Sequence, residues 1–168
     1  SYAGAITLQS NATIGVRNSG TLTLTGGINK AGFNVTFLGN GAATNTTNIN
    51  TVGISGPADV IVDAMTVNLN VANGYVGPTT IQNGGILNAN VASALPTGTF
   101  SAVSIDATSR LNLNNGIAQS VASLSGAGIV NNTAAGTNTL TISPTAGSTN
   151  FSGSIQNSLG TLNVVKNG

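Results

Sequence analysis

The sequence predicts an all-β fold, a parallel β-helix in which about three short strands form each coil and no significant helix occurs. The first observation is that helix formers are scarce, because Glu is absent and Gly, Asn and Thr fill much of the chain. The second is that short runs of alternating apolar and polar residues recur between Gly and Asn breaks. The third is that similar runs return after about 20 to 24 residues, a period typical of a solenoid.

The alternating runs are the predicted strands. Apolar residues tend to occupy every second position, which directs them to one face of a strand and their polar neighbours to the other. Turn signals such as Asn83-Gly84-Gly85 and Asn115-Gly116 separate the runs. In chain order, the predicted strands are residues 5–8, 12–16, 21–25, 34–38, 48–54, 59–63, 65–71, 79–82, 85–91, 102–106, 110–114, 129–132, 139–143 and 161–165.

Repetition of one run suggests how the coils stack. Residues 68–71 (NLNV) recur about 20 residues later as residues 88–91 (NANV), and residues 112–114 (NLN) follow after about 24 more. Roughly seven or eight coils at about 4.8 Å per coil would give a rod of roughly 35 Å. Asn at one height of successive coils can form an amide ladder. Two sets of residues are either such ladders or turn residues in an Asn-rich chain: Asn68/Asn88/Asn112 and Asn70/Asn90/Asn114.

The competing architecture is an antiparallel β-sandwich, which also has short strands and frequent turns. The Asn40-Gly41 and Asn73-Gly74 pairs are possible hairpin turns. Aromatic residues make up only 4% of the chain, which is low for a sandwich core. The β-helix is therefore the preferred prediction.

Composition limits the classes of function. Only 4% of residues are charged, against about 25% in ordinary soluble domains, yet 40% are hydrophobic, so the chain can form a core and is not predicted to be disordered. The net charge of +1 includes no cluster of Lys and Arg, which argues against nucleic-acid binding. No apolar run is long enough for a transmembrane helix. The lack of Cys, together with many Asn, Thr and Gly, favours a bacterial surface protein.

Residues 73–98 carry a recognisable set of motifs: GPTTI at 77–81, GGIL at 84–87 and ASAL at 92–95. This stretch resembles the autotransporter-associated β-strand repeat of bacterial autotransporter passenger domains. The resemblance covers residues 64–168 and, more loosely, residues 3–56. It implies a right-handed β-helix, export across the outer membrane and display at the cell surface. One departure is VDAMTVNLNVA at 62–72, which stands where the family has Gly-Thr-Leu-Thr-Leu.

The C-terminal residues also predict that the chain is part of a longer repeat array. Residues 161–165 form a strand-like run that is followed directly by the turn signal Lys166-Asn167-Gly168. We therefore expect residues 1–168 to be a single β-helix segment, cut from a longer repeat array.

Few residues suit catalysis or cofactor binding. Without His or Cys, the chain has no Ser-His or Cys-His arrangement. Asp59 and Asp63, four residues apart on one predicted strand, would be separated by about 13 Å, beyond the roughly 5–9.5 Å of glycosidase pairs. Adding Asp106 gives three acids in two segments, sparse ligation for calcium. We predict no enzyme activity, no catalytic or metal site and no cofactor.

The prediction for function is a structural rod or fibre segment of a surface-exposed or secreted bacterial protein. Its expected partners are copies of itself or adjacent repeats of the same chain. The alternative is an adhesin that binds surface glycans or host proteins through its lateral face, with residues 39–48 and 134–138 as exposed binding loops. A third possibility, a polysaccharide lyase-like β-helix, would depend on Asp59, Asp63 and Asp106.

Overall fold

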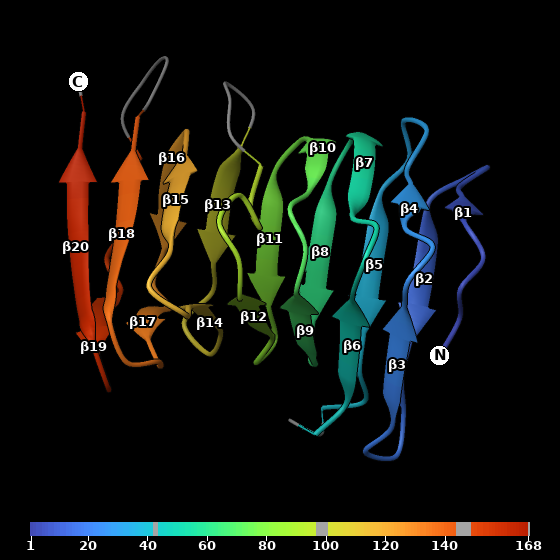
Figure 1. Ribbon diagram of the computed structural model, residues 1–168, viewed down its shortest axis with the longest axis horizontal. Helices are drawn as coiled ribbons and strands as arrows, with labels where there is room; N and C mark the ends of the chain where they lie inside the picture. The colour runs from blue at the N-terminus through green and yellow to red at the C-terminus, as the bar shows by residue number, and fades with distance from the viewer. Residues whose placement is uncertain (42–43, 97–100, 144–148, 168) are drawn as a thin grey trace.

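The computed structural model describes residues 1–41, 44–96, 101–143 and 149–167. Within these ranges the chain forms 20 strands and no helix, and the strands stack along one long axis from the N-terminal to the C-terminal end (Figure 1). The strands are β1 (Ile6–Thr7), β2 (Ala12–Gly15), β3 (Thr21–Leu24), β4 (Ile28–Asn29), β5 (Val35–Leu38), β6 (Thr46–Ile49), β7 (Ile54–Pro57), β8 (Val60–Asp63), β9 (Thr66–Leu69), β10 (Gly74–Val76), β11 (Thr79–Gln82), β12 (Ile86–Ala89), β13 (Ala102–Ile105), β14 (Arg110–Leu113), β15 (Ala118–Val121), β16 (Ser123–Gly126), β17 (Ile129–Asn132), β18 (Thr137–Ile142), β19 (Ser154–Asn157) and β20 (Thr161–Lys166).

Four sheets form the faces of the stack. The largest has seven strands in the order β19-β17-β14-β12-β9-β6-β3, and the next has six in the order β16-β13-β11-β8-β5-β2. The other strands form two smaller sheets, β1-β4-β7-β10 and β15-β18-β20. All pairings within these sheets are parallel, so the predicted parallel β-helix is confirmed and the antiparallel sandwich is wrong.

Each coil contributes one strand to the seven-stranded sheet. Coil 1 contains β1–β3, coil 2 β4–β6, coil 3 β7–β9, coil 4 β10–β12, coil 5 β13 and β14, coil 6 β15–β17, and coil 7 β18 and β19, and β20 begins the next coil by pairing with β18. Paired residues in this sheet lie between 19 and 25 positions apart, as from Arg110 to Ile129 and from Thr21 to Thr46. Residues 62–72, where the sequence departs from the autotransporter repeat, keep the regular pairing.

Inward-pointing side chains from the faces form one narrow apolar core. Val35 and Phe37 of β5 stack directly on Val60 and Val62 of β8, and all four are almost fully buried. Burying one such side chain stabilises the fold by about 1.5–3 kcal/mol, so stacked apolar columns are the main driving force for coil formation.

The structure corrects several predicted strands. The run 48–54 is two strands, because Thr51, with φ of 68°, turns the chain between β6 and β7. Strands β4, β10, β15, β16 and β19 were not predicted; they are short, or consist largely of Ala, Gln, Ser and Gly, so they lack the alternating apolar signal. Their partners in neighbouring coils hold them in extended conformation.

Candidate functional site

Two ladders of side-chain amides run along the outside of the seven-stranded sheet, which we call the ladder face. In the inner ladder, the side-chain N–H of Asn68 donates to Asn48 at 2.7 Å, Asn88 to Asn68 at 2.6 Å and Asn112 to Asn88 at 2.7 Å. In the outer ladder, the same bonds join Asn50, Asn70, Asn90 and Asn114 at 2.7, 2.6 and 2.7 Å. Of the two interpretations of the repeated Asn residues, the ladder is confirmed.

The ladders end in different ways. The hydroxyl of Thr133 donates to Asn114 Oδ1 and so closes the outer ladder. In the inner ladder Asn131 lies opposite Asn112, but its side-chain N–H donates to Ser158 Oγ at 2.8 Å instead. Asn112 Oδ1 is consequently buried without a hydrogen-bond partner. The inner ladder therefore stops at coil 5, whereas the outer ladder is completed at coil 6.

The ladder face consists almost entirely of uncharged side chains. A third column beside the amides contains Thr21, Thr46 and Thr66, followed by Ile86 and by Arg110, the one charged residue in these columns. Amides and hydroxyls at regular spacing can donate and accept hydrogen bonds, but they have no group that titrates near neutral pH. The face is thus suited to holding coils together or to contacting another polar surface, and not to acid–base chemistry.

Buried amides at the corners bind the backbone of neighbouring coils, a role that the alternating sequence pattern does not predict. Asn73 Oδ1 accepts from Ile54 N at 2.7 Å, and its Nδ2 donates to Ala94 O at 2.8 Å. Asn138 and Gln119 make equivalent pairs of bonds to backbone groups. Such corners leave few buried backbone groups without partners, since each amide offers both a donor and an acceptor.

These buried corners also correct the two predicted binding loops. Residues 46–48 of the first loop belong to β6, Asn45 is fully buried, and residues 42–43 lie outside the described residues. In the second loop, residues 137–138 belong to β18, and Asn138 is fully buried. Both segments are therefore shorter than predicted, although residues 40, 41 and 44 of the first and residues 135–137 of the second are exposed.

Two of the three aspartates lie in one column of the six-stranded sheet. Asp63 pairs with Gln82, and Asp106 directly follows Ile105, the residue paired with Ile81. The backbones of the two aspartates are therefore two coils, or about 10 Å, apart along the axis of the stack. Asp63 accepts hydrogen bonds from the side chains of Gln82 and Asn83 at 2.8 and 2.9 Å. Asp59 lies outside this column, at the turn before β8.

The surroundings of Asp106 do not suit a general acid. Its carboxylate accepts from the backbone N–H of Asn83 at 2.5 Å and from that of Thr108 at 3.0 Å. Burial alone would raise the pKa of Asp106, but hydrogen bonds to the carboxylate outweigh burial and lower it below the ordinary 3.8. A general acid needs the opposite shift. Among the described residues, no three or more His, Cys, Asp or Glu are grouped so that they could hold a metal ion.

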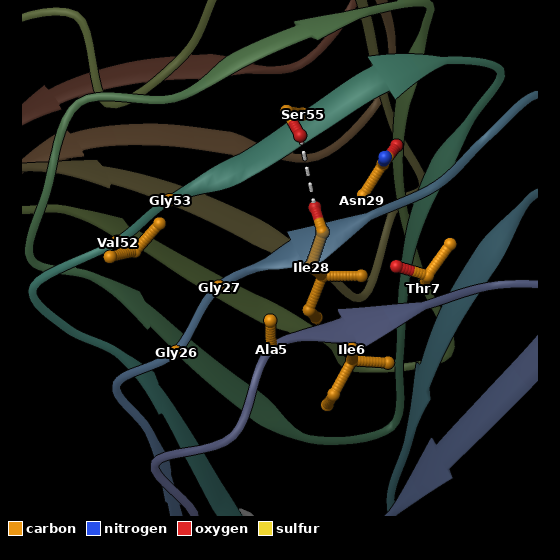
Figure 2. Close-up of a pocket in the computed structure, with 10 residues that line it drawn as sticks. All are labelled: Ala5, Ile6, Thr7, Gly26, Gly27, Ile28, Asn29, Val52, Gly53 and Ser55. Carbon is orange, nitrogen blue, oxygen red and sulfur yellow. Dashed lines mark hydrogen bonds between the residues drawn. The ribbon is translucent and has the colours of Figure 1, made fainter.

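A shallow groove of about 150 Å³ crosses β1, β4 and β7 (Figure 2). Its glycines are explained by coil stacking, because a Cβ on Gly26 would lie 2.3 Å from Gly4 O and one on Gly53 2.4 Å from Ala72 O. The volume is below the roughly 300–1,000 Å³ of small-molecule sites, and we assign the groove no ligand. It is lined by Ala5, Ile6, Thr7, Gly26, Gly27, Ile28, Asn29, Val52, Gly53 and Ser55.

Lys30 is the one fully buried charged side chain among the described residues, with an exposed fraction of 0%. Its Nζ donates to Ala58 O and lies 4.8 Å from the ring centroid of Tyr75. Burial lowers the pKa of Lys30 from 10.5 to about 8, and the negative charge of Asp59 partly opposes the shift. The sequence signal for the burial of Lys30 was the alternation Ile28-Asn29-Lys30, because it places Lys30 on the same inward side as Ile28.

Comparisons with known proteins find no relative. No family model, no curated protein and no solved structure matches the chain. The resemblance to autotransporter repeats therefore depends on the sequence motifs alone. No helix within the described residues is long and apolar enough to cross a membrane.

Proposed function

We propose that this chain is a non-catalytic structural rod, part of the passenger region of a bacterial autotransporter or of a similar surface-exposed or secreted protein. The observation that carries the proposal is the unbroken stacking of coils, in which parallel backbone pairing and two amide ladders run along the same axis. Such a rod would hold another part of the protein away from the cell surface.

The motifs that resemble the autotransporter repeat coincide with one coil, which supports this assignment. Residues 77–81 form the corner before β11 and most of that strand, residues 84–87 form the next turn and the start of β12, and residues 92–95 form the following corner. One sequence repeat therefore equals one structural repeat, as expected for a repeat array.

The regular rise allows a direct test of the rod function. Copies of residues 66–85, one coil by the pairing of Thr66 with Ile86, are inserted after Gly85 in a surface-anchored chain with a fluorophore at each end. Five inserted coils should lengthen the rod by about 24 Å. The distance between the two fluorophores, measured by energy transfer, should grow with the number of inserted coils. A distance that does not change with the number of coils would contradict the rod function.

Location needs a separate measurement. An antibody raised against the folded segment should label intact cells of the source organism, and protease added outside those cells should remove the signal. Labelling only after the cells are opened would overturn the surface assignment while leaving the rod function open to the length experiment.

The ladder face favours a second candidate function, an adhesin that binds laterally. Its amides and hydroxyls repeat at about 4.8 Å, which suits repeated hydrogen bonding to surface glycans, to host proteins or to another copy of the chain. Replacing Asn70, which is exposed, and Asn90, which is half-buried, together by Thr should abolish such binding in a glycan array and in a sedimentation assay. The control is the pair Thr13→Ser and Thr36→Ser, which changes two polar residues on the six-stranded sheet and leaves the ladder face intact.

A further inference from the structure

Lys30, Gly56 and Tyr75 occupy equivalent inward positions in three successive coils. Asn29 pairs with Ser55, and Ser55 in turn pairs with Gly74, so the residues that follow them lie one above another in coils 2, 3 and 4. Gly56, in the middle coil, places no side chain between the other two. The Lys30 ammonium and the Tyr75 ring are in contact across coil 3, with 4.8 Å between Nζ and the ring centroid.

The local backbone is shaped around this contact. Gly56 has φ of 85°, and a Cβ there would lie 3.1 Å from Ala31 N and from Asn29 Oδ1. Ala58 adopts φ of 79°, a conformation that residues other than glycine rarely adopt, and its carbonyl accepts the bond from Lys30. The Tyr75 hydroxyl lies 2.7 Å from Thr79 Oγ1, which fixes the ring.

We propose that Lys30, Gly56 and Tyr75 form a tie that joins coils 2, 3 and 4 into one unit, which opens as a whole. In an ordinary solenoid each repeat contacts only its neighbours, so coils can open one at a time. A contact from coil 2 to coil 4 adds a coupling that nearest-neighbour stacking lacks. The bond from Lys30 to Ala58 includes coil 3 in the same unit.

The burial of Lys30 makes the stability of the fold depend on pH. Asp59 and Tyr75 are the titratable groups that act on Lys30: Asp59 favours its charged form, and the ring faces the ammonium. Since the pKa of Lys30 is about 8 in the folded protein and 10.5 in the unfolded chain, the unfolded chain binds more protons between these values. Stability should therefore rise as the pH rises from 8 to 10.5. Burial raises the pKa of Tyr75, so loss of its proton opposes folding only above about 10.

Hydrogen exchange, read amide by amide at pH 7, tests the tie. The reporters are the N–H groups of Lys30, Val60 and Asn73, which bond across the boundaries from coil 2 to coil 5. In the wild-type protein they should exchange with one common opening constant. In Lys30→Met, whose side chain is similar in length but apolar, the constants should separate by tenfold or more. Lys166→Met, which changes an exposed lysine, is the matched control and should behave as wild type.

A double-mutant cycle with Tyr75→Leu gives the second readout. If Lys30 and Tyr75 are coupled, the effect of the double substitution on the opening constants should differ from the product of the two single effects by about threefold to thirtyfold, the range of cation–π contacts from exposed to desolvated sites. The rise in urea midpoint between pH 8 and pH 9.5 should disappear in Lys30→Met.

The proposal would be overturned if the three reporters of the wild-type protein had different opening constants. It would also be overturned if the effect of the double substitution equalled the product of the two single effects. If Lys30→Met fails to fold, Tyr75→Leu decides the matter, because it keeps the bond from Lys30 to Ala58 and removes the contact with coil 4, and Tyr75→Phe, which loses the hydroxyl bond to Thr79 but keeps the ring, is its control. Unchanged common opening in Tyr75→Leu would then count against the tie.

Discussion

An amide in the middle of a ladder has two amide partners, whereas the last one has a single partner. Asn88 both donates to Asn68 and accepts from Asn112. Asn112 donates to Asn88, but its own Oδ1 is buried and unpaired. A buried polar group without a partner costs about 1–3 kcal/mol, so position in the ladder should decide the effect of a substitution.

We therefore expect Asn88→Ala to lower the free energy of unfolding by about 1–3 kcal/mol, because it leaves one acceptor on Asn68 and one donor on Asn112 unpaired. Asn112→Ala should cost less, since it removes the unpaired Oδ1 together with the one bond. Urea unfolding of the two variants measures the difference. Equal losses, or a greater loss for Asn112→Ala, would show that the ladder bonds do not set local stability.

The hydrogen bonds to Asp106 predict a loss of stability in acid. Because its pKa is lowered in the folded protein, the carboxylate stabilises the fold above about 3.8, and this contribution is lost as the pH falls through the lower folded value. Asp106→Asn should flatten the corresponding part of a thermal-unfolding profile between pH 5 and pH 2. An acid transition of the same size in wild type and variant would mean that other groups account for it.

At the scale of the element, turns limit which residues the strands can carry at their ends. Gly126 and Gly32 have almost the same φ, 101° and 97°, but different surroundings. A Cβ on Gly126 would lie 2.0 Å from Ile105 O in the previous coil, whereas a Cβ on Gly32 would meet nothing within 4 Å. The pair separates the effect of close coil packing from that of backbone strain.

Gly32→Ala should cost about 1–2 kcal/mol, the strain of a left-handed alanine. Gly126→Ala should cost more than about 3 kcal/mol, because the coil must also move away from Ile105. Thermal unfolding of both variants gives the comparison. If the two substitutions cost the same, the close approach of β16 to β13 is easily relaxed, and the stack is softer than its geometry indicates.

The sequence predicted those elements that carry a periodic signal. The ladder residues were identifiable because Asn68, Asn88 and Asn112 recur in the same short context. Strands such as β4 and β10 were not, since two or three residues are too few to show alternation. The column of Lys30, Gly56 and Tyr75 was also hidden, because these residues share no pattern and meet only through the lengths of the intervening coils.

At the scale of the whole molecule, register is the property on which all the columns depend. A shift of one residue in a strand moves each side chain to the opposite face, so apolar residues would leave the core and amides would enter it. The inner ladder and the core column of Val67 and Leu87 are held by the same pairing of β9 with β12. Loss of register should therefore break both together.

Deleting one coil tests this dependence. Removal of residues 66–85 brings Ile86 to the position of Thr66, so that Asn88 should bond Asn48 and the inner ladder should close again. Removal of residues 66–86, one residue more, places the following strand out of register if the turns keep their lengths. Both deletions are made in Lys30→Met, because they remove Tyr75. Circular dichroism and urea unfolding should show a cooperative β-fold for the first and its loss for the second, and similar behaviour of the two would mean that stacking tolerates a shift in register.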